Sequence, residues 1–534
     1  MRKKHLRSFA PISDLSTGDS EIFKGGDNNK HTPKKPSDTK ISAALPQNKD
    51  AINHIFSTDI NFDFVIRDFK VRFRDKYADA FLIFYDGLTN AELVNRDIMA
   101  PLMSIGAVDT TDFSSLEECV YECMLSQAPN SKKYDMQDVV DLVGFGNCAV
   151  FVDGCTCCFV ADVKGWSKRG VDRPVTEAVL SGPQEAFCET IMANIALVRK
   201  ILKDPKLIAE KIPVGTRSKT PCALMYIDGI TNPRLVEEAR HRLLSIDTQY
   251  IFSSADVEMM IEDSTLFPLP QLLKTERPDR AAAQLCDGKV LIVVQGSPFV
   301  LILPASLKDL AEASEDNYVR VAEANFMRFV RLVGCFLALF LPGIFLSIVL
   351  YHHESIPTDL LFAIEASREQ MPFPTVIELL IMILSFELIK EAAVRVPDPV
   401  GSTLGIVGGL ILGQSAVSAG IASPLLIIIV SIAALGSFTA PSISVSRAIS
   451  LIQLLFVILG YLAGFLGIAV GVFCLFCYMS RESSFGVSYL APSSTSENPF
   501  FIVPIWMREL RPKSLFSLQL KKQPHISRKW KGDE

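Results

Sequence analysis

The sequence has few of the residues on which most enzyme active sites depend. Its 534 residues include only 7 histidines, and most of these lie near the ends of the chain or beside an apolar run. No Ser/His/Asp or Cys/His set of the kind that activates a nucleophile can be assembled from them. We therefore do not expect an enzyme, and no motif indicates a bound cofactor.

Cysteine is present but lacks the spacing of a metal site. The 12 cysteines are densest at Cys148, Cys155, Cys157 and Cys158, where neither paired CxxC motifs nor neighbouring histidines occur. Structural zinc sites are built from such pairs. We therefore expect packed thiols and no metal.

A secretion signal and an excess of basic charge are also lacking. The basic N-terminus, MRKKHLRSFAPISD, has no apolar core of signal-peptide length. The formal net charge of −6 provides no basic surface for nucleic acid. These absences predict an N-terminal half that starts in the cytoplasm, where its cysteines stay reduced.

Long uncharged runs are confined to about the last 200 residues. Residues 332–351 form a run of 20, residues 400–446 one of 47, and residues 448–480 one of 33. Because a helix needs roughly 20 apolar residues to cross a bilayer, these runs predict an α-helical polytopic membrane domain at 329–480. The last run is long for one straight helix and short for two full crossings, so its path stays open.

The distribution of charge around these runs predicts their orientation. Residues 508–534 carry eight Lys or Arg and three acids, whereas the loop at 352–374 carries four acids and one Arg. By the positive-inside tendency, the tail is expected in the cytoplasm and the loop outside. The N-terminal half and the tail then share the cytoplasmic side.

An internal repeat organises the first 312 residues. FYDGLTNAELV begins at Phe84 and YIDGITNPRLV at Tyr226, 142 residues later, and GNCAVFVDG at Gly146 aligns with GKVLIVVQG at Gly288 at the same offset. Each unit combines β-rich runs, an Asp-Gly turn and a helical pattern. The repeat predicts two similar α/β subdomains, at 62–178 and 179–312. In their turns, glycine is expected to supply positive φ and aspartate to cap the turn or the following helix.

Three further segments complete the predicted organisation. Residues 1–61 are rich in Lys, Asp, Ser, Pro and Gly, and predict a disordered polar arm. Residues 313–328, ASEDNYVRVAEANFMR, predict an amphipathic helix that couples the α/β half to the first crossing. Residues 481–534 form a basic cytoplasmic tail.

Glycines recur at helical spacing in two of the uncharged runs. They are spaced by four residues over 401–413, and by four, three and four over 460–471. Small residues on one helix face let another backbone approach closely, so we expect tight helix packing within one chain or between copies. The candidate packing positions are Gly401, Gly405, Gly409, Gly413, Gly460, Gly464, Gly467 and Gly471.

One apolar segment carries charges that a lipid-facing helix would not tolerate. As a helix, 375–395 places four charges in a stripe about 140° wide, with a fifth on the opposite face. Ion-pair spacing neutralises part of this charge, yet each charge facing lipid would cost roughly 2.5–3.5 kcal/mol. Two interpretations stay open: an interfacial amphipathic helix, or a helix lining a hydrated path for cations. The candidate pore or subunit-contact residues are Glu378, Glu387, Lys390, Glu391, Arg395 and Gln414.

Several long motifs in one order resemble a known family. SREQMPFPTVIELL from Ser367 and FELIKEAAVRVPDPVGSTLGIVGGLILGQSAVSAGIASP from Phe386 are similar to the signature of the A subunits of bacterial spore germinant receptors, the GerA family. GPQEAF, TERPD, GSPFVLILP and SEDNYVR in the N-terminal half agree with that pattern. The sequence departs from it at Ser415, Ser418 and Ala422, where the family more often has Ala, Gln and Val.

The resemblance implies a subunit of a nutrient germinant receptor in the spore inner membrane. It implies a permease-like B subunit and a lipoprotein C subunit as partners, contact with membrane lipid, and a homo-oligomer that acts as a ligand-gated cation channel. Two alternatives remain: a non-conducting scaffold or signalling subunit that couples the permease-like partner to downstream germination, and a transporter of the nutrient itself.

Overall fold

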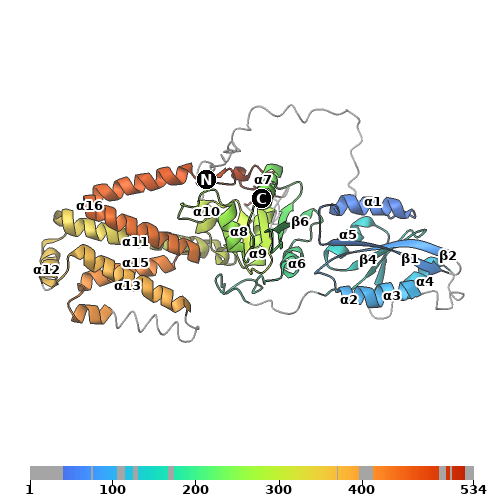
Figure 1. Cartoon of the computed structure of the whole chain (residues 1–534), viewed down its shortest axis with the longest axis horizontal. Helices are drawn as coiled ribbons and strands as arrows, with labels where there is room; N and C mark the ends of the chain where they lie inside the picture. Colours follow the sequence, from blue (N-terminus) through green and yellow to red (C-terminus); the bar gives the residue numbers. More distant parts are fainter. Residues whose placement is uncertain are drawn as a thin grey trace, which may run out of the picture.

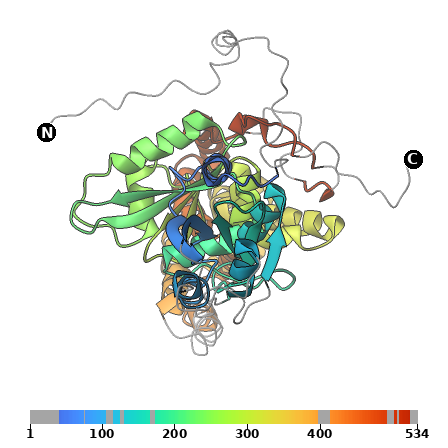
Figure 2. The same ribbon diagram turned by 90° about the vertical axis from the view of Figure 1, so that its right-hand side faces the viewer.

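A computed structural model describes residues 40–522, apart from residues 74–75, 105–114, 124–129, 166–172, 370, 396–412, 492–500 and 506–507. Figure 1 shows them as a row in which an apolar helical half and two α/β units follow one another. Figure 2 looks along this row from the end formed by the first unit. Each α/β unit has its own five-stranded sheet, so the predicted pair of α/β subdomains is confirmed.

Subdomain 1 is an antiparallel sheet covered on both faces. Its strands lie in the order β1-β2-β4-β5-β3. Because both faces are covered, β2 reads as a nearly continuous apolar run: Phe81 and Ile83 enter one core, and Leu82 and Phe84 enter the other. The strands are β1 Phe64–Phe73, β2 Lys76–Tyr85, β3 Asn130–Lys133, β4 Cys148–Val152 and β5 Cys158–Ala161.

The helices of subdomain 1 include one that the sequence analysis assigned to the disordered arm. One face of the sheet carries α1 (Leu45–Phe56) and α5 (Met136–Gly144). The other carries α2 (Ala91–Leu93), the π-helix η3 (Val94–Met99), α3 (Ala100–Ser104) and α4 (Leu116–Cys123). The predicted boundary at residue 62 is therefore wrong: Ile52 and Phe56, one helical turn apart, are fully buried in the core of subdomain 1. Residues 1–39 of the predicted arm lie outside the described residues.

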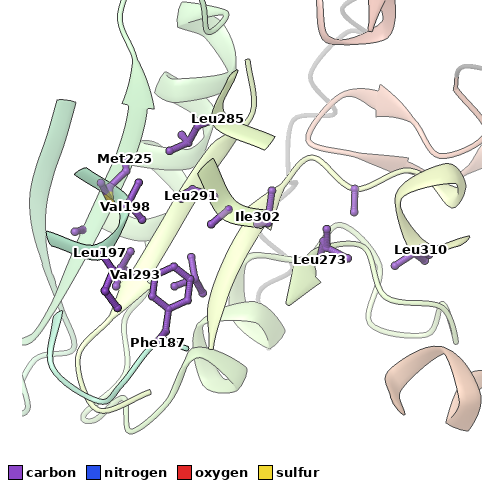
Figure 3. Close-up of a cluster of buried hydrophobic side chains, with 14 of the residues drawn as sticks. Phe187, Leu197, Val198, Met225, Leu273, Leu285, Leu291, Val293, Ile302 and Leu310 are labelled. Atoms are coloured by element: carbon purple, nitrogen blue, oxygen red, sulfur yellow. The ribbon is translucent and has the colours of Figure 1, made fainter. Parts of the chain in front are cut away.

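Subdomain 2 repeats this topology. Its strands lie in the order β6-β7-β9-β10-β8, and the starts of β9 and α9 follow those of β4 and α5 by 142 residues. Figure 3 shows one of its two cores, where Met225 and Leu291 of the sheet lie near Val198 and Leu285 of two helices. The elements are α6 Ile191–Ile201, β6 Leu207–Val214, β7 Thr220–Ile227, α7 Pro233–Leu244, α8 Ser254–Ile261, β8 Leu273–Thr275, α9 Pro278–Cys286, β9 Val290–Val294, β10 Val300–Leu303 and α10 Leu307–Ala311.

The repeated Asp-Gly turns are structural, with one difference from expectation. Gly87 and Gly229 have φ of 86° and 76°, the left-handed region that glycine adopts at low cost. The helix caps, however, are not the aspartates. The side chains of Asn90 and Asn232 accept the first backbone N–H groups of α2 and α7, because the amide oxygen three residues after the glycine reaches the N-terminus.

The predicted coupling helix at 313–328 is not a separate helix. A 3-10 turn, η6 (Ser314–Asn317), comes first, and α11 then begins at Val321 and continues to Tyr351. At this turn the side chain of Asp316 accepts hydrogen bonds from Arg328 and Arg331 of α11. The first turns of α11 and the apolar run therefore form one continuous helix.

The helical half contains two helices that are long and apolar enough to cross a membrane, α11 and α16 (Ile443–Arg481), among the described residues. The remaining elements are η7 (His353–Ser355), α12 (Thr358–Arg368), α13 (Thr375–Arg395) and α15 (Pro424–Phe438). A kink at Ala463 and Gly464 divides α16. Val445 near its start and Met479 near its end enter the same core, so α16 is a helical hairpin with both ends at subdomain 2.

Much of the predicted basic tail is folded onto subdomain 2. It includes the strands β11 (Ser483–Ser484) and β12 (Val487–Ser488) and the turn η9 (Lys513–Leu515). Arg511 is buried and donates to the carbonyl of Cys286 at the end of α9, over 2.7 Å. The Leu518 N–H donates to Ile230 O, whereas the equivalent carbonyl of subdomain 1, Leu88 O, accepts from Gly165. The tail therefore donates to subdomain 2 the hydrogen bond that, in subdomain 1, comes from the segment just after β5.

Candidate functional site

The charged end of α13 is held by hydroxyl groups of two other helices. Lys390 Nζ lies 2.7 Å from Glu387 Oε1 and donates to Ser437 Oγ of α15 over 2.8 Å. Ser450 Oγ of α16 donates to Glu387 Oε1 over 2.9 Å. The side chains of Lys390 and Glu387 are 18% and 39% exposed, so the pair is packed on one side and open on the other.

This pair lies at the end of the helical half that faces subdomain 2. Thr439, two residues beyond Ser437, donates its hydroxyl to Arg331 O of α11, and Arg331 itself pairs with Asp316. The preceding residues of α13, 379–386, are uncharged. The stripe is thus near the boundary of the apolar half, a position that fits both an interfacial helix and the mouth of a hydrated path.

Glu378 has a different environment from the rest of the predicted set. It is 1% exposed, and its carboxylate accepts the backbone N–H of Ser423 at the N-terminus of α15. A carboxylate beside a helix N-terminus interacts favourably with the helix dipole. Its described contacts are therefore within its own chain, and its assignment to a pore or subunit contact stays a prediction.

For the other predicted members of the charged set, the structure gives the exposure or only the backbone position. Glu391 is exposed one turn beyond Glu387, and Gln414 is exposed at the start of a short helical turn. The backbone of Arg395 ends α13, but its side chain lies outside the described residues. Of the predicted set, the described contacts bring Glu387 and Lys390 together.

The second glycine series packs within the chain. A Cβ at Gly460 would lie 2.6 Å from Gly343 O of α11, and Gly464 forms the kink of α16 with φ of 59°. Gly467 and Gly471 face Leu459 across the hairpin. The described contacts of this series thus include close packing within the chain.

The first glycine series is mostly outside the described residues. Gly401, Gly405 and Gly409 fall there, so their packing stays a prediction. Gly413 is described, and among the described residues a Cβ on it would meet the side chain of Ile427, at 3.8 Å.

A buried ion cluster joins subdomain 2 to α11. Asp316, 3% exposed, accepts from Arg328 over 2.9 Å and from Arg331 over 3.0 Å. Arg328 also lies 3.3 Å from Glu312, and Arg331 donates to Ala311 O. Because both arginines belong to α11 and both acceptor segments follow the sheet of subdomain 2, this cluster fixes the helix to the α/β half.

A second buried ion pair joins the two subdomains. Arg199 of α6 forms two hydrogen bonds with the Asp63 carboxylate, at 2.5 and 2.7 Å, and a third with Asn61. Its guanidinium also stacks on Tyr85. Burial raises the pKa of Tyr85 to about 12, against the opposing effect of Arg199.

The cysteine cluster of subdomain 1 is a packed set of neutral thiols. Cys148, Cys155, Cys157 and Cys158 are all buried. Burial raises the pKa of Cys155 to about 11 and that of Cys157 to about 12. Within the part of the chain that the structure describes, no group of His, Cys, Asp or Glu is arranged to hold a metal ion.

Sequence reasoning missed the polar partners of the charged residues. Ser437 and Ser450 are each one of several hydroxyl groups in mostly apolar helices, and Asp63 lies 136 residues from Arg199. The only available signal was the presence of charged residues in apolar surroundings. Such residues need polar partners, but the sequence does not show which residues these are.

The molecule is thus a two-part protein in which an α/β half is fixed by buried ions to an apolar helical half. Residues 50–514 match the family model described as Bacillus/Clostridium GerA spore germination protein. The chain belongs to the GerA family of spore germination proteins, and the resemblance of its motifs is confirmed.

Three relatives show how far the similarity extends. Spore germination protein KA of Bacillus subtilis (strain 168) is 34% identical, over 85% of this chain and 84% of the relative. Spore germination protein GerLA of Bacillus cereus is 33% identical, over 85% and 92%. The crystal structure of the N-terminal domain of the A subunit of the Bacillus megaterium spore germinant receptor GerK3 is 29% identical, with a TM-score of 0.39, and the match covers 49% of this chain and 96% of that one.

Proposed function

We propose that this germinant receptor subunit oligomerises into a ligand-gated cation channel in the spore inner membrane. Ion release through it starts germination when a nutrient is present. A permease-like B subunit and a lipoprotein C subunit are its proposed partners. The family supports the role in germination, and the conduction step rests on the charged end of α13.

The observation that carries the proposal is the half-open pair of Glu387 and Lys390. Ser437 and Ser450 fix these two side chains from within the protomer, while 39% of the Glu387 side chain stays exposed. Exposed Glu391 follows one turn later. Carboxylates that are positioned by the fold and open on one side attract cations to a hydrated path.

The proposed topology follows from the directions of the helices. Glu378 contacts the start of α15 and Lys390 contacts its end, so α13 and α15 run in parallel toward subdomain 2. The hairpin of α16 leaves and returns to the same side. A multi-pass membrane domain with the α/β half and the tail both in the cytoplasm fits these directions and the basic tail.

One observation favours the alternative of a non-conducting scaffold. The Asp316 cluster fixes subdomain 2 to α11, which is the connection that a subunit needs if it only transmits a change from a partner to downstream components. In that case the charges of α13 would be structural, and conduction would belong to another subunit.

The substitution Glu387→Gln separates the two functions in spores. Glutamine keeps an oxygen that accepts from Lys390 and Ser450 but removes the negative charge, so the fold is retained. A channel predicts normal protein level and nutrient-triggered cation release slowed by about tenfold, equivalent to ~1.4 kcal/mol. The matched control is Glu354→Gln, at an exposed position beyond the end of α11. Release unchanged by Glu387→Gln would favour the scaffold.

A further inference from the structure

Exposed apolar side chains gather where α11 emerges from the apolar half. On α11, Phe326, Phe329 and Val330 are 61%, 59% and 42% exposed. Their spacing of three and four residues places them on one helix face. Arg328 and Arg331 pair with Asp316 instead, so the first turns of α11 have a charged face toward subdomain 2 and an apolar face toward the surroundings.

A segment of the tail is attached at the same level. The side chain of Asn325 donates to Ile502 O over 3.1 Å and accepts the Ile502 N–H over 2.7 Å. Ile502 is buried, whereas its neighbours Phe501 and Val503 are 59% and 40% exposed, and Ile505 is 65% exposed. The paired hydrogen bonds hold this apolar segment against α11 with its side chains outward.

We call the exposed set Phe326, Phe329, Val330, Phe501, Val503 and Ile505 the ledge. Its position along α11 indicates what covers it. The uncharged run of α11 begins at residue 332, and a helix rises 1.5 Å per residue. Val330 and Phe329 therefore lie about 3–5 Å outside the start of the apolar run, within the headgroup region next to the hydrocarbon core, and Asn325 with the attached tail lies about 10 Å outside it, at the outer edge of that region.

The ledge has the composition of an interfacial contact. Phe and other large apolar side chains form the lipid-facing side of segments that lie in the membrane interface. Segments that bury an apolar face about 5–10 Å into the headgroup boundary attach proteins to a bilayer without crossing it. Two chain segments separated by more than 170 residues contribute, so the surface is built by the fold and is not a continuation of the crossing helix.

We propose that the ledge is an interfacial membrane anchor, which inserts the tail segment 501–505 into the cytoplasmic leaflet beside α11. The proposal rests on the membrane placement of the helical half. It assigns a function to the tail: the lipid surface holds residues 501–505, while Arg511 and Leu518 of the same tail are held by subdomain 2. The tail thereby connects the bilayer surface to the α/β half, independently of the Asp316 cluster.

Photo-crosslinking of the full chain in vesicles of phosphatidylglycerol and phosphatidylethanolamine tests the anchor. The photoreactive residue is introduced by Phe501→p-benzoylphenylalanine, at an exposed position where the fold does not depend on the side chain. The matched control is the same substitution at Tyr77, which is 68% exposed on the β1–β2 hairpin of subdomain 1. We expect a mass increase of one phospholipid at position 501 and none at position 77.

Photo-crosslinking at a third position tests the membrane placement of the helical half separately from the anchor. Phe473 is 69% exposed within the uncharged run of α16, and the same substitution there reports whether the helical half is in the bilayer. Lipid adducts at 473 but not at 501, or a crosslink from 501 to a second copy of the chain, would overturn the anchor alone. Absence of lipid adducts at both positions would overturn the anchor and the membrane placement together.

Discussion

Arg199 and Asp63 form a two-point ion pair between the two subdomains, with Nε–Oδ2 and Nη2–Oδ1 separations of 2.5 and 2.7 Å. Their side chains are 3% and 0% exposed. The pair, with Asn61 as an additional acceptor, joins the two subdomains beside the backbone hydrogen bond from the Phe62 N–H to Ala209 O.

Asp63→Asn should destabilise the α/β half strongly, because it leaves the Arg199 guanidinium buried without a counter-charge. Breaking a buried pair in this way costs about 3–5 kcal/mol. Asp68→Asn is the control: Asp68 pairs with Lys49 at the surface, where the loss is about 0–1 kcal/mol. Thermal unfolding of the purified full chain compares the two variants. Equal melting temperatures for both would contradict a role of the Arg199 pair in stability.

Gly460→Ala should disrupt the contact of α11 with α16. A Cβ there would lie 2.6 Å from Gly343 O, so the helices must separate, at a cost of about 1–3 kcal/mol. Gly413→Ala is the matched control, because its nearest neighbour among the described residues would be 3.8 Å away. Size-exclusion chromatography in detergent measures the recovery of folded protein. Equal recovery of both variants would show that the close helix contact is unimportant.

Asp316→Asn should release the first turns of α11 from subdomain 2. The change leaves Arg328 and Arg331 without the carboxylate that holds them. Hydrogen exchange at residues 321–331 should accelerate by about tenfold or more, corresponding to ~1.4 kcal/mol. Glu323→Gln, at an exposed position on the same helix, should leave exchange unchanged. Slow exchange in the Asp316 variant would mean that the helix is held in another way.

Alkaline pH should destabilise subdomain 1 through its buried thiols. Burial raises the pKa of Cys155 to about 11 and that of Cys157 to about 12, whereas an unfolded thiol titrates near about 8.5. Between these values the unfolded chain releases protons that the folded chain keeps, so stability is complete below about pH 8.5 and falls as pH rises. Unfolding measured from pH 7 to 10 should show this loss, and Cys155→Ala/Cys157→Ala should reduce it. An identical pH dependence in that variant would assign the loss to other groups.

The sequence predicted the repeat well because its signals are local. The Asp-Gly turns at Gly87 and Gly229 and the apolar β-runs depend on residues close together in the chain, and both are found in the structure. The aspartates were expected to cap either the turn or the following helix, and only the second alternative is contradicted, because asparagine also forms such caps. Only the backbone geometry shows that Asn90 and Asn232 reach the helix N-termini.

Long-range contacts account for what the sequence left open. The run at 448–480 could not be assigned from its length, and the kink at Gly464 is needed to show a hairpin. The spacing of Glu387 and Lys390 predicted an ion pair, whereas the burial of Glu378 depends on Ser423, 45 residues later. Likewise, α1 packs on subdomain 1 through Ile52 and Phe56. The apolar face that they form is short, and polar residues surround it in the sequence, so the sequence did not indicate it.

Cation efflux from vesicles tests the central claim of nutrient-gated conduction most directly. Vesicles loaded with K⁺ would contain the full chain together with its B and C partner subunits, and efflux would be measured with and without candidate nutrients. The account predicts nutrient-dependent efflux that Glu387→Gln reduces and Glu354→Gln does not. Absence of efflux from an intact complex, with a nutrient that triggers germination in spores bearing the same receptor, would contradict the channel and leave the scaffold function.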